Sequence, residues 1–268
     1  MIAKNLISQI RLLHHKKHRD EQQLFIVEGV KSCMETVQSN FELVQCFATE
    51  RFDRNMIDKT FTPVSEKEME RISCFSTPSE ILCIVKKPQF SLTGFDDEKP
   101  LLVLDAIRDP GNLGTIIRTA DWFGFDQIIC SEDCVEFTNP KVIQASMGSF
   151  TRTKIVFTKL SDYLATKTHR AIYGLYMNGE PVQKQSFKNN DMVIIGSESH
   201  GISETLSPYI TKKIEIPIFP HEGTSPESLN AAIAAGIFMH EYRKSKIVNL
   251  YETFNPQRHP RLSSGRDD

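Results

Sequence analysis

The chain has 268 residues, 40% hydrophobic and 25% charged, with a formal net charge of −2; this suits one large soluble domain or two modest ones. The net charge excludes a globally basic protein, so any contact with nucleic acid must come from a local basic patch. The six cysteines form no CxxC pair and have no histidine cluster at zinc-ligand spacing, and no run approaches the roughly 18 apolar residues of a membrane span. We therefore expect no metal, no membrane segment and, without a signal-peptide pattern, a cytoplasmic protein.

The first part of the chain, residues 1–90, is predicted to form a small α/β domain. Apolar periodicity predicts a helix over residues 5–15, another after Gly29 through Met34, and a third over 66–72. Short runs of β-forming residues predict strands at 24–27, 43–47 and 81–85. From residue 86 the periodicity is lost and Lys, Pro, Gly and Asp accumulate, so we place a linker at 91–99.

Residues 100–245 alternate between strand and helix patterns. Strands are predicted at 101–104, 127–130, 155–157, 171–176 and 192–195, and helices at 112–123, 140–147, 160–166, 204–209 and about 226–243. This alternation predicts an α/β domain with a mostly parallel sheet covered on both faces. Residues 246–268 are polar, with Pro, Ser and Gly, and are predicted to be a disordered tail.

The first polar stretch follows the strand at 101–104. Asp109-Pro110-Gly111-Asn112 has the chemistry of a type II turn, with a positive φ expected at Gly111. Asn112 is then a suitable N-cap for a helix that ends at Gly124 and carries Arg118 near its middle. A capped surface helix with an ordinary exposed arginine explains this stretch equally well.

The second stretch, Gly196-Ser197-Glu198-Ser199-His200-Gly201, follows the strand at 192–195. Its two glycines permit close approach of the backbone to a ligand, and ligands of open α/β sheets bind beyond the carboxyl ends of strands. Glu198 can bond ligand hydroxyls or cap the following helix, and for a lone carboxylate the capping role is favoured.

The third stretch begins with Ile214-Glu-Ile216-Pro217-Ile218 and continues into the last predicted helix. We expect Thr224 or Ser225 to cap that helix, with Pro226 in its first turn. Ser228 and Asn230 would then lie in or just after the first turn, where the positive helix end favours an anion. A core helix with polar capping residues explains the apolar stripe but not this second polar pair.

Together the three stretches resemble the motifs of the SpoU (TrmH-type) RNA 2′-O-ribose methyltransferases of the SPOUT superfamily. The resemblance covers residues 101–243 and runs N-x-G-x-x-x-R-T-A, then G-S-E-x-x-G, then I-P-I and S-L-N. It implies a trefoil knot, an obligate homodimer and bound S-adenosylmethionine. Residues 17–19 and 25–29 are similar to the ribosomal-protein-like substrate-binding domain of that family. The two common nucleotide-binding motifs, GxGxxG and GxxxxGK[ST], are absent, which opposes a metabolic enzyme with a nucleotide cofactor.

The resemblance also implies the residues of the site. Those expected to bind the cofactor are Gly196, Ser197, Glu198, Gly201, Ile216, Ile218, Ser228 and Leu229. Those expected at the reaction centre are Asn112, Arg118, Glu198, Ser228 and Asn230. Family accounts make the arginine a general base; because an arginine pKa exceeds about 12, we favour a role in orienting the hydroxyl and stabilising the developing alkoxide. The loop over 219–226 is longer than is usual in the family, so the shape of the pocket is expected to differ.

A basic run near the N-terminus, residues 11–19, is the candidate RNA surface, with Lys16, Lys17 and Arg19 joined by Arg118. Such a run is more often only a solvated face, but beside these motifs RNA contact is favoured. Ribosomal RNA is the preferred substrate, because the N-terminal domain resembles that of rRNA-modifying members. The alternatives are a tRNA methyltransferase and a catalytically silent RNA-binding or ribosome-assembly factor on the same scaffold.

Overall fold

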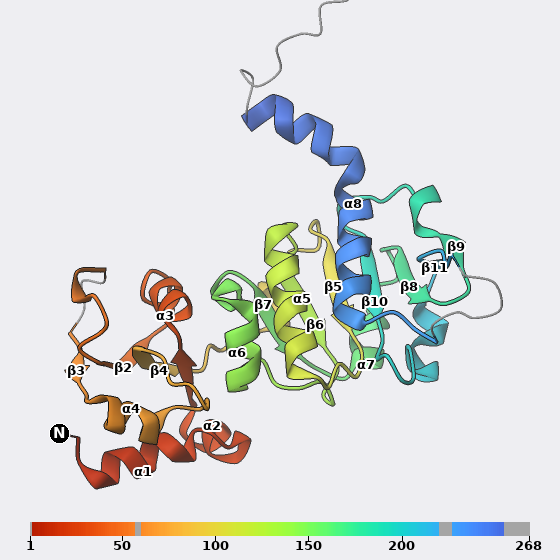
Figure 1. Cartoon of the computed structure of the whole chain (residues 1–268). Coiled ribbons are helices and arrows are strands. Elements are labelled where there is room, and N and C mark those ends of the chain that lie inside the picture. Colours follow the sequence, from red (N-terminus) through yellow and green to blue (C-terminus); the bar gives the residue numbers. More distant parts are fainter. Residues whose placement is uncertain (1, 57–59, 220–226, 255–268) are drawn as a thin grey trace, which may run out of the picture.

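The computed structural model describes residues 2–56, 60–219 and 227–254, and in the last helix it describes side chains only as far as Lys244. Figure 1 shows two α/β units, each built on its own sheet, with the first unit beside helix α6 of the second. Among the described helices, none is both long and apolar enough to cross a membrane.

The first unit is a four-stranded sheet with four helices. The sheet order is β1-β4-β2-β3, antiparallel except for the short parallel pair β2–β3. Its elements are α1 Lys4–Leu12, α2 Lys16–Gln22, β1 Leu24–Glu28, α3 Val30–Val37, β2 Leu43–Ala48, 3₁₀ turn η1 Arg54–Met56, β3 Thr62–Pro63, α4 Glu66–Ile72 and β4 Ile81–Lys86. The prediction of a single helix over 5–15 is wrong at its C-terminal end, because His15 has extended backbone angles and a second helix starts at Lys16.

The second unit is a seven-stranded sheet in which every strand pair is parallel, as predicted from the alternating pattern. The strand order is β7-β6-β5-β10-β8-β11-β9. Its elements are β5 Leu101–Leu104, α5 Pro110–Trp122, β6 Gln127–Cys130, α6 Pro140–Ser146, η3 Ser149–Thr151, β7 Lys154–Phe157, α7 Leu160–Leu164, β8 Ile172–Tyr176, β9 Glu180–Pro181, η4 Val182–Lys184, β10 Met192–Ile195, η5 Glu204–Tyr209, β11 Lys212–Glu215 and α8 Ala231–Phe254.

The central strands β5, β6 and β10 are buried along their whole length, because helices cover both faces of the sheet. On one face α5 and α8 run side by side, and a Cβ added at Gly236 of α8 would lie 3.6 Å from the Thr119 methyl of α5. Both helices start at the carboxyl end of the sheet, so their first turns lie beside the loop that follows β10.

The two units share one apolar core instead of being joined by a free linker. Phe25 of β1 contacts Phe137 and Phe150 of the second unit, with ring centroids 6.2 and 6.1 Å apart. The segment predicted as a linker contains the short turn η2 Leu92–Gly94, and Asp97 within it pairs with the Lys167 ammonium at 2.6 Å. The segment over 91–99 is therefore held against the second unit by this ion pair.

The last helix differs from its prediction at both ends. It starts at Ala231 instead of near Pro226, and it continues to Phe254, past the start of the tail predicted at 246. Burial of Phe238, Met239 and Tyr242 fixes its inner face. The remainder of the predicted tail, 255–268, lies outside the described residues.

Candidate active site

A hydrogen-bond network joins the three polar stretches at the carboxyl end of the sheet. Glu198 Oε1 accepts from Asn112 Nδ2 at 2.8 Å, from Asn230 Nδ2 at 2.6 Å and from the backbone N–H of Ala231 at 3.0 Å. Asn230 Nδ2 also donates to Asn112 Oδ1 at 2.8 Å. Between described residues, no hydrogen bond uses the other carboxylate oxygen of Glu198, so within this part of the chain Oε2 is available to a ligand.

Glu198 plays the capping role that the sequence favoured, but for a different helix. It bonds the first N–H of α8, 33 residues further along the chain, where the positive helix end stabilises its charge. Asn230 is the N-cap of α8, because its Oδ1 accepts from the N–H groups of Ala232 and Ile233 at 3.0 and 3.2 Å. Asn230 thus precedes the first turn, and the expected caps Thr224 and Ser225 lie outside the described residues.

Helix α5 also starts differently from the prediction. Asp109, not Asn112, is its N-cap, and the Asp109 carboxylate accepts from the Asn112 backbone N–H at 2.7 Å. Pro110 takes the first helical position and Gly111 has no positive φ, so the expected type II turn is instead the first turn of the helix. Asn112 therefore has its side-chain amide free to bond Glu198. The helix ends before Gly124, which has the expected positive φ of 69°.

The loop after β10 is folded tightly on itself. A Cβ added at Gly196 would lie 2.1 Å from the carbonyl carbon and oxygen of Gly201, so only glycine fits there. Gly201 has a φ of 66°, and Ser197 and Gly201 exchange backbone hydrogen bonds. The buried carboxylate of Asp105, at the end of β5, accepts from the Ser203 N–H at 2.7 Å and fixes the end of this loop. Asp105 was not predicted as a site residue, although a carboxylate directly after a buried strand was a visible signal.

A large cavity of about 560 Å³ opens beside this loop, between the ends of β8, β10 and β11 and the start of α8. Apolar side chains of Leu175, Ile195 and Ile237 line it together with the polar groups of Asn178 and Glu227. All eight residues expected to bind a cofactor also line it: Gly196, Ser197, Glu198, Gly201, Ile216, Ile218, Ser228 and Leu229.

A second hollow of about 360 Å³, the Asn112 hollow, adjoins the large cavity and shares with it Ser197, Glu198, Gly201 and Ala231. Its polar lining includes Arg108, Asp133 and His200 besides Asn112. The Ser131 hydroxyl, followed by the Arg108 guanidinium, lowers the pKa of the Asp133 carboxyl, so Asp133 is ionised at neutral pH. No roles were predicted for Arg108 or His200, although Arg108 directly precedes Asp109 and His200 lies within the loop over 196–201.

Comparison with known proteins identifies the family. Residues 99–240 match the profile of the SpoU rRNA Methylase family, and residues 4–83 match the MRM3-like substrate binding domain. The chain belongs to the SpoU rRNA methylase family. The 23S rRNA (guanosine(2553)-2′-O)-methyltransferase RlmP of Bacillus subtilis is 27% identical over 251 residues, covering 90% of this chain and 97% of that protein.

Solved SpoU-type structures have the same fold over almost the whole chain. A TrmH-family protein from Porphyromonas gingivalis has a TM-score of 0.79 at 31% identity, covering 91% of this chain and 99% of that one. An AdoMet-bound rRNA methyltransferase from Sinorhizobium meliloti has a TM-score of 0.79 at 25% identity, covering 91% and 96%. The family resemblance and the α/β fold class expected from the motifs are thus confirmed.

Arg118, the remaining SpoU motif residue, stands apart from the network. It is exposed on α5, 6 residues beyond Asn112, on the face that also carries Thr115 and the 84% exposed Trp122. It is not among the described residues that line the large cavity or the Asn112 hollow. Within one chain, therefore, the structure brings together Asn112, Glu198 and Asn230 but not Arg118.

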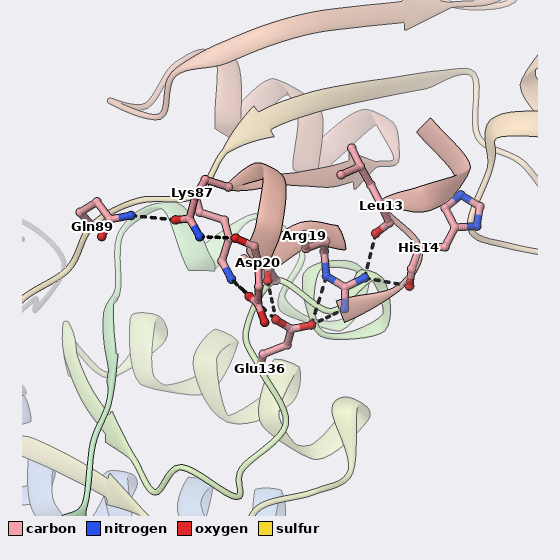
Figure 2. Close-up of polar contacts among 9 residues, drawn as sticks. Leu13, His14, Arg19, Asp20, Lys87, Gln89 and Glu136 are labelled. Carbon is pink, nitrogen blue, oxygen red and sulfur yellow. Dashed lines mark hydrogen bonds and ion pairs between the residues drawn. The ribbon is translucent and has the colours of Figure 1, made fainter. Parts of the chain in front are cut away.

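Arg19 does not belong to an RNA-contacting surface, because its side chain is only 2% exposed. Figure 2 shows its guanidinium between the backbone carbonyls of Leu13 and His14 and the carboxylate of Glu136. It pairs with that carboxylate and so joins the first unit to the second. Lys16 and Lys17 are exposed on α2, and Lys17 faces Glu21 at 3.9 Å.

Proposed function

We propose that this chain transfers a methyl group from S-adenosylmethionine to a ribose 2′-hydroxyl of ribosomal RNA. The observation that carries the proposal is the pair of adjoining hollows in the catalytic part of a SpoU methylase, with Glu198 in their common wall. The large cavity would hold the cofactor and the Asn112 hollow the target ribose. Two partners bound on either side of one wall are held close together, which is the main requirement of a group transfer.

The large cavity suits the chemistry of S-adenosylmethionine. Apolar side chains such as Leu175, Ile195 and Ile216 match the faces of an adenine ring, while Ser197 and Ser228 offer hydrogen bonds at polar edges. Glu198 Oε2 can accept from a cofactor hydroxyl or ammonium group. When bound, the cofactor supplies an electrophilic sulfonium methyl group. The residues of the chain need only orient the ribose oxygen and help its proton to leave.

Arg118 is inferred to orient the ribose hydroxyl or a neighbouring phosphate and to stabilise the developing negative charge. Since Arg118 lies outside the hollows of its own chain, we infer a homodimer in which it reaches the site of the partner. Trp122 on α5 and Ile233 on α8, 84% and 54% exposed, fit this arrangement, because burial of these apolar side chains against a partner chain would be favourable.

Exchange of subunits tests this arrangement. Arg118→Ala and Gly196→Ala chains are each expected to be inactive, one lacking the arginine and the other the cofactor loop. After random mixing, a C2 dimer that shares its sites would recover about a quarter of wild-type activity, because half of the dimers contain one complete site of two. Absence of recovery would mean that Arg118 acts within its own chain.

The substrate class follows from the relatives. RlmP is named as a methyltransferase of a 23S rRNA guanosine, and it matches this chain over 90% of its length. We therefore infer 23S rRNA as the substrate and, because ribosomes are assembled there, a cytoplasmic location. The same proposal includes a substrate-binding domain over 1–90 and a methyltransferase domain over 100–245. It also includes a trefoil knot, which is inferred from the shared fold alone.

Mapping of ribose methylation in total rRNA and tRNA from a strain lacking this protein tests the function. We expect a single 2′-O-methyl mark in 23S rRNA to be lost, and to return with wild-type protein but not with Arg118→Ala. A lost mark in tRNA would favour the tRNA alternative. If no mark is lost in either pool, the chain is a silent RNA-binding or assembly factor.

A further inference from the structure

A basic hollow lies in the first unit, away from the active site. Helices α1 and α4 surround it, and we call it the α1–α4 hollow. Its volume is about 340 Å³, and its polar lining is Lys4, Ser8, Arg11, His14, His15 and Arg71. Lys4 and Arg11 are seven residues apart in α1, so they lie on one face of that helix, and His15 follows the end of the helix.

Among the residues that the structure describes, no carboxylate forms an ion pair with the cations of this hollow. Lys4, Arg11 and Arg71 are exposed, and none of them takes part in an ion pair between described residues. Some other surface cations of the same unit have carboxylate partners, for example Arg51 with Glu66 at 2.8 Å and Lys86 with Glu42 at 3.0 Å. Cations gathered without counter-charges repel one another, so a concave group of them favours an anion.

His14 adds no positive charge to the hollow. His14 Nε2 lies 3.0 Å from the Ile72 carbonyl oxygen, which can only accept, so that nitrogen carries the proton. Burial lowers the pKa of the His14 ring, which leaves it neutral at physiological pH. Lys4, Arg11 and Arg71 carry the positive charge on which the hollow depends.

The hollow is also held at a fixed place relative to the active site. Arg19 Nη1 donates to the carbonyls of Leu13 and His14, each at 2.8 Å, at the edge of the hollow. The same guanidinium donates through Nε to Glu136 of the second unit at 3.1 Å (Figure 2). In Figure 1, α1 and α2 lie on the lower side of the molecule, the side at which α5 and α8 begin. One RNA could therefore contact both places.

We propose that the α1–α4 hollow binds a phosphodiester group of the rRNA substrate, distant from the nucleotide that is methylated. Lys4, Arg11 and Arg71 supply the charge, and the Arg19–Glu136 contact keeps the bound phosphate in register with the Asn112 hollow. This inference rests on the proposed function. It extends that function by naming a second RNA contact, which contributes to binding of the RNA but takes no part in methyl transfer. Contacts of this kind position the substrate.

The test compares two triple variants of the full chain. Lys4→Ala/Arg11→Ala/Arg71→Ala removes the charges of the hollow. Lys31→Ala/Arg51→Ala/Lys86→Ala removes the same number of exposed charges from other elements of that unit. Binding to an unmodified 23S rRNA transcript is measured over a range of salt concentrations, and S-adenosylmethionine binding is measured by calorimetry.

We expect the hollow variant to bind RNA at least about tenfold more weakly at low salt. Its slope of log affinity against log salt should fall by about 0.7–0.9 for each phosphate that the variant no longer neutralises. The control variant should change neither the RNA affinity nor the salt slope. Both triple variants should still bind S-adenosylmethionine. The charge-retaining variant Lys4→Arg/Arg11→Lys/Arg71→Lys should bind RNA with wild-type affinity. Equal salt slopes in the hollow and control variants, or failure of the charge-retaining variant to restore binding, would overturn the proposal.

Different outcomes refute the phosphate site and the proposed methyl transfer. If wild-type protein methylates the transcript while the hollow variant binds it normally, only the phosphate site is wrong. If wild-type protein binds the transcript through the hollow but methylates no RNA, the phosphate site stands and the proposed reaction fails.

Discussion

One carboxylate oxygen of Glu198 accepts hydrogen bonds from Asn112, Asn230 and the Ala231 N–H, so this side chain ties the loop after β10 to both α5 and α8. Within the described part of the chain, the other oxygen remains available at the wall between the two hollows. A single residue thus holds the site together and presents a charge to a ligand.

Replacing this charge should weaken cofactor binding. Hydrogen bonds to charged groups contribute about 1.5–3 kcal/mol, so Glu198→Gln is expected to lower S-adenosylmethionine affinity by about 10- to 100-fold. Isothermal titration calorimetry measures the effect, with Glu204→Gln, an exposed carboxylate of η5, as the control. Equal affinities for the two variants would show that Glu198 is only a structural cap.

Gly196 provides a second prediction. An alanine Cβ at this position would overlap the backbone of Gly201, so the loop must shift and the cavity wall with it. We expect Gly196→Ala to reduce cofactor affinity at least about tenfold, as misplacement near a reacting centre commonly does. Gly94→Ala is the matched control, because no atom lies within 4 Å of its added Cβ. Unchanged cofactor binding by Gly196→Ala would contradict the role assigned to this loop.

At the residue scale, Asn112, Glu198 and Asn230 were predicted as site residues from the resemblance to the SpoU motifs, while the local pattern placed them only at helix starts and after a strand end. Arg108 and His200 were missed because only the tertiary fold brings them to one hollow. Arg19 was placed wrongly because its partner Glu136 lies 117 residues away, a distance over which charge patterns carry no information.

At the scale of elements, helix caps decide where the site helices begin. Asp109 caps α5 and Asn230 caps α8, and each helix therefore starts at a different residue from the one predicted. Several residues in each stretch could cap, so the local pattern did not decide between them. In α5 Asp109 caps the helix and the Asn112 side chain bonds Glu198, whereas in α8 Asn230 caps with its oxygen and bonds Glu198 with its nitrogen.

Helix α4, beside the α1–α4 hollow, has a capping box that should be visible in the pH dependence of stability. The Ser65 N–H, then the Ile2 N–H and the Ser65 hydroxyl, lower the pKa of Glu68 from 4.5 to about 2. A carboxyl whose pKa is lowered in the folded state stabilises that state above its unfolded pKa, and this contribution is lost as pH falls from about 4.5 to 2.

The measurement is the difference in free energy of unfolding between wild type and Glu68→Gln, followed by urea denaturation from pH 6 to pH 2. We expect the difference to favour wild type at pH 6 and to shrink as the solution is acidified. Glu70→Gln, which removes a carboxylate of the same helix outside the capping box, is the control. A constant difference across this range would contradict the assignment.

At the scale of the whole molecule, the two units form one body with a buried ion pair at their junction. The Arg19–Glu136 contact, the nearby Lys87 ammonium at 3.8 Å from Glu136 and the phenylalanine cluster all cross it. The sequence predicted two sheets and their order along the chain, because strand and helix periods are local. It could not predict this junction, which depends on residues far apart in sequence.

Breaking the junction should separate RNA recognition from cofactor binding. Glu136→Gln leaves the buried Arg19 guanidinium without its counter-charge, and loss of one partner of a buried pair costs about 3–5 kcal/mol of stability. We expect a raised KM for 23S rRNA with unchanged S-adenosylmethionine affinity. Glu132→Gln, an exposed neighbour, is the control. A fall in kcat with KM unchanged would show that the junction does not position the RNA.

The most direct test of the proposed reaction is transfer of label from S-[methyl-³H]adenosylmethionine to an unmodified 23S rRNA transcript by the purified protein. We expect one labelled nucleotide, recovered after alkaline hydrolysis as a resistant dinucleotide, because a 2′-O-methyl group blocks cleavage of the adjacent phosphodiester. We also expect Arg118→Ala to abolish the label. Label that alkali releases as a methylated mononucleotide would place the methyl group on a base and contradict ribose methylation.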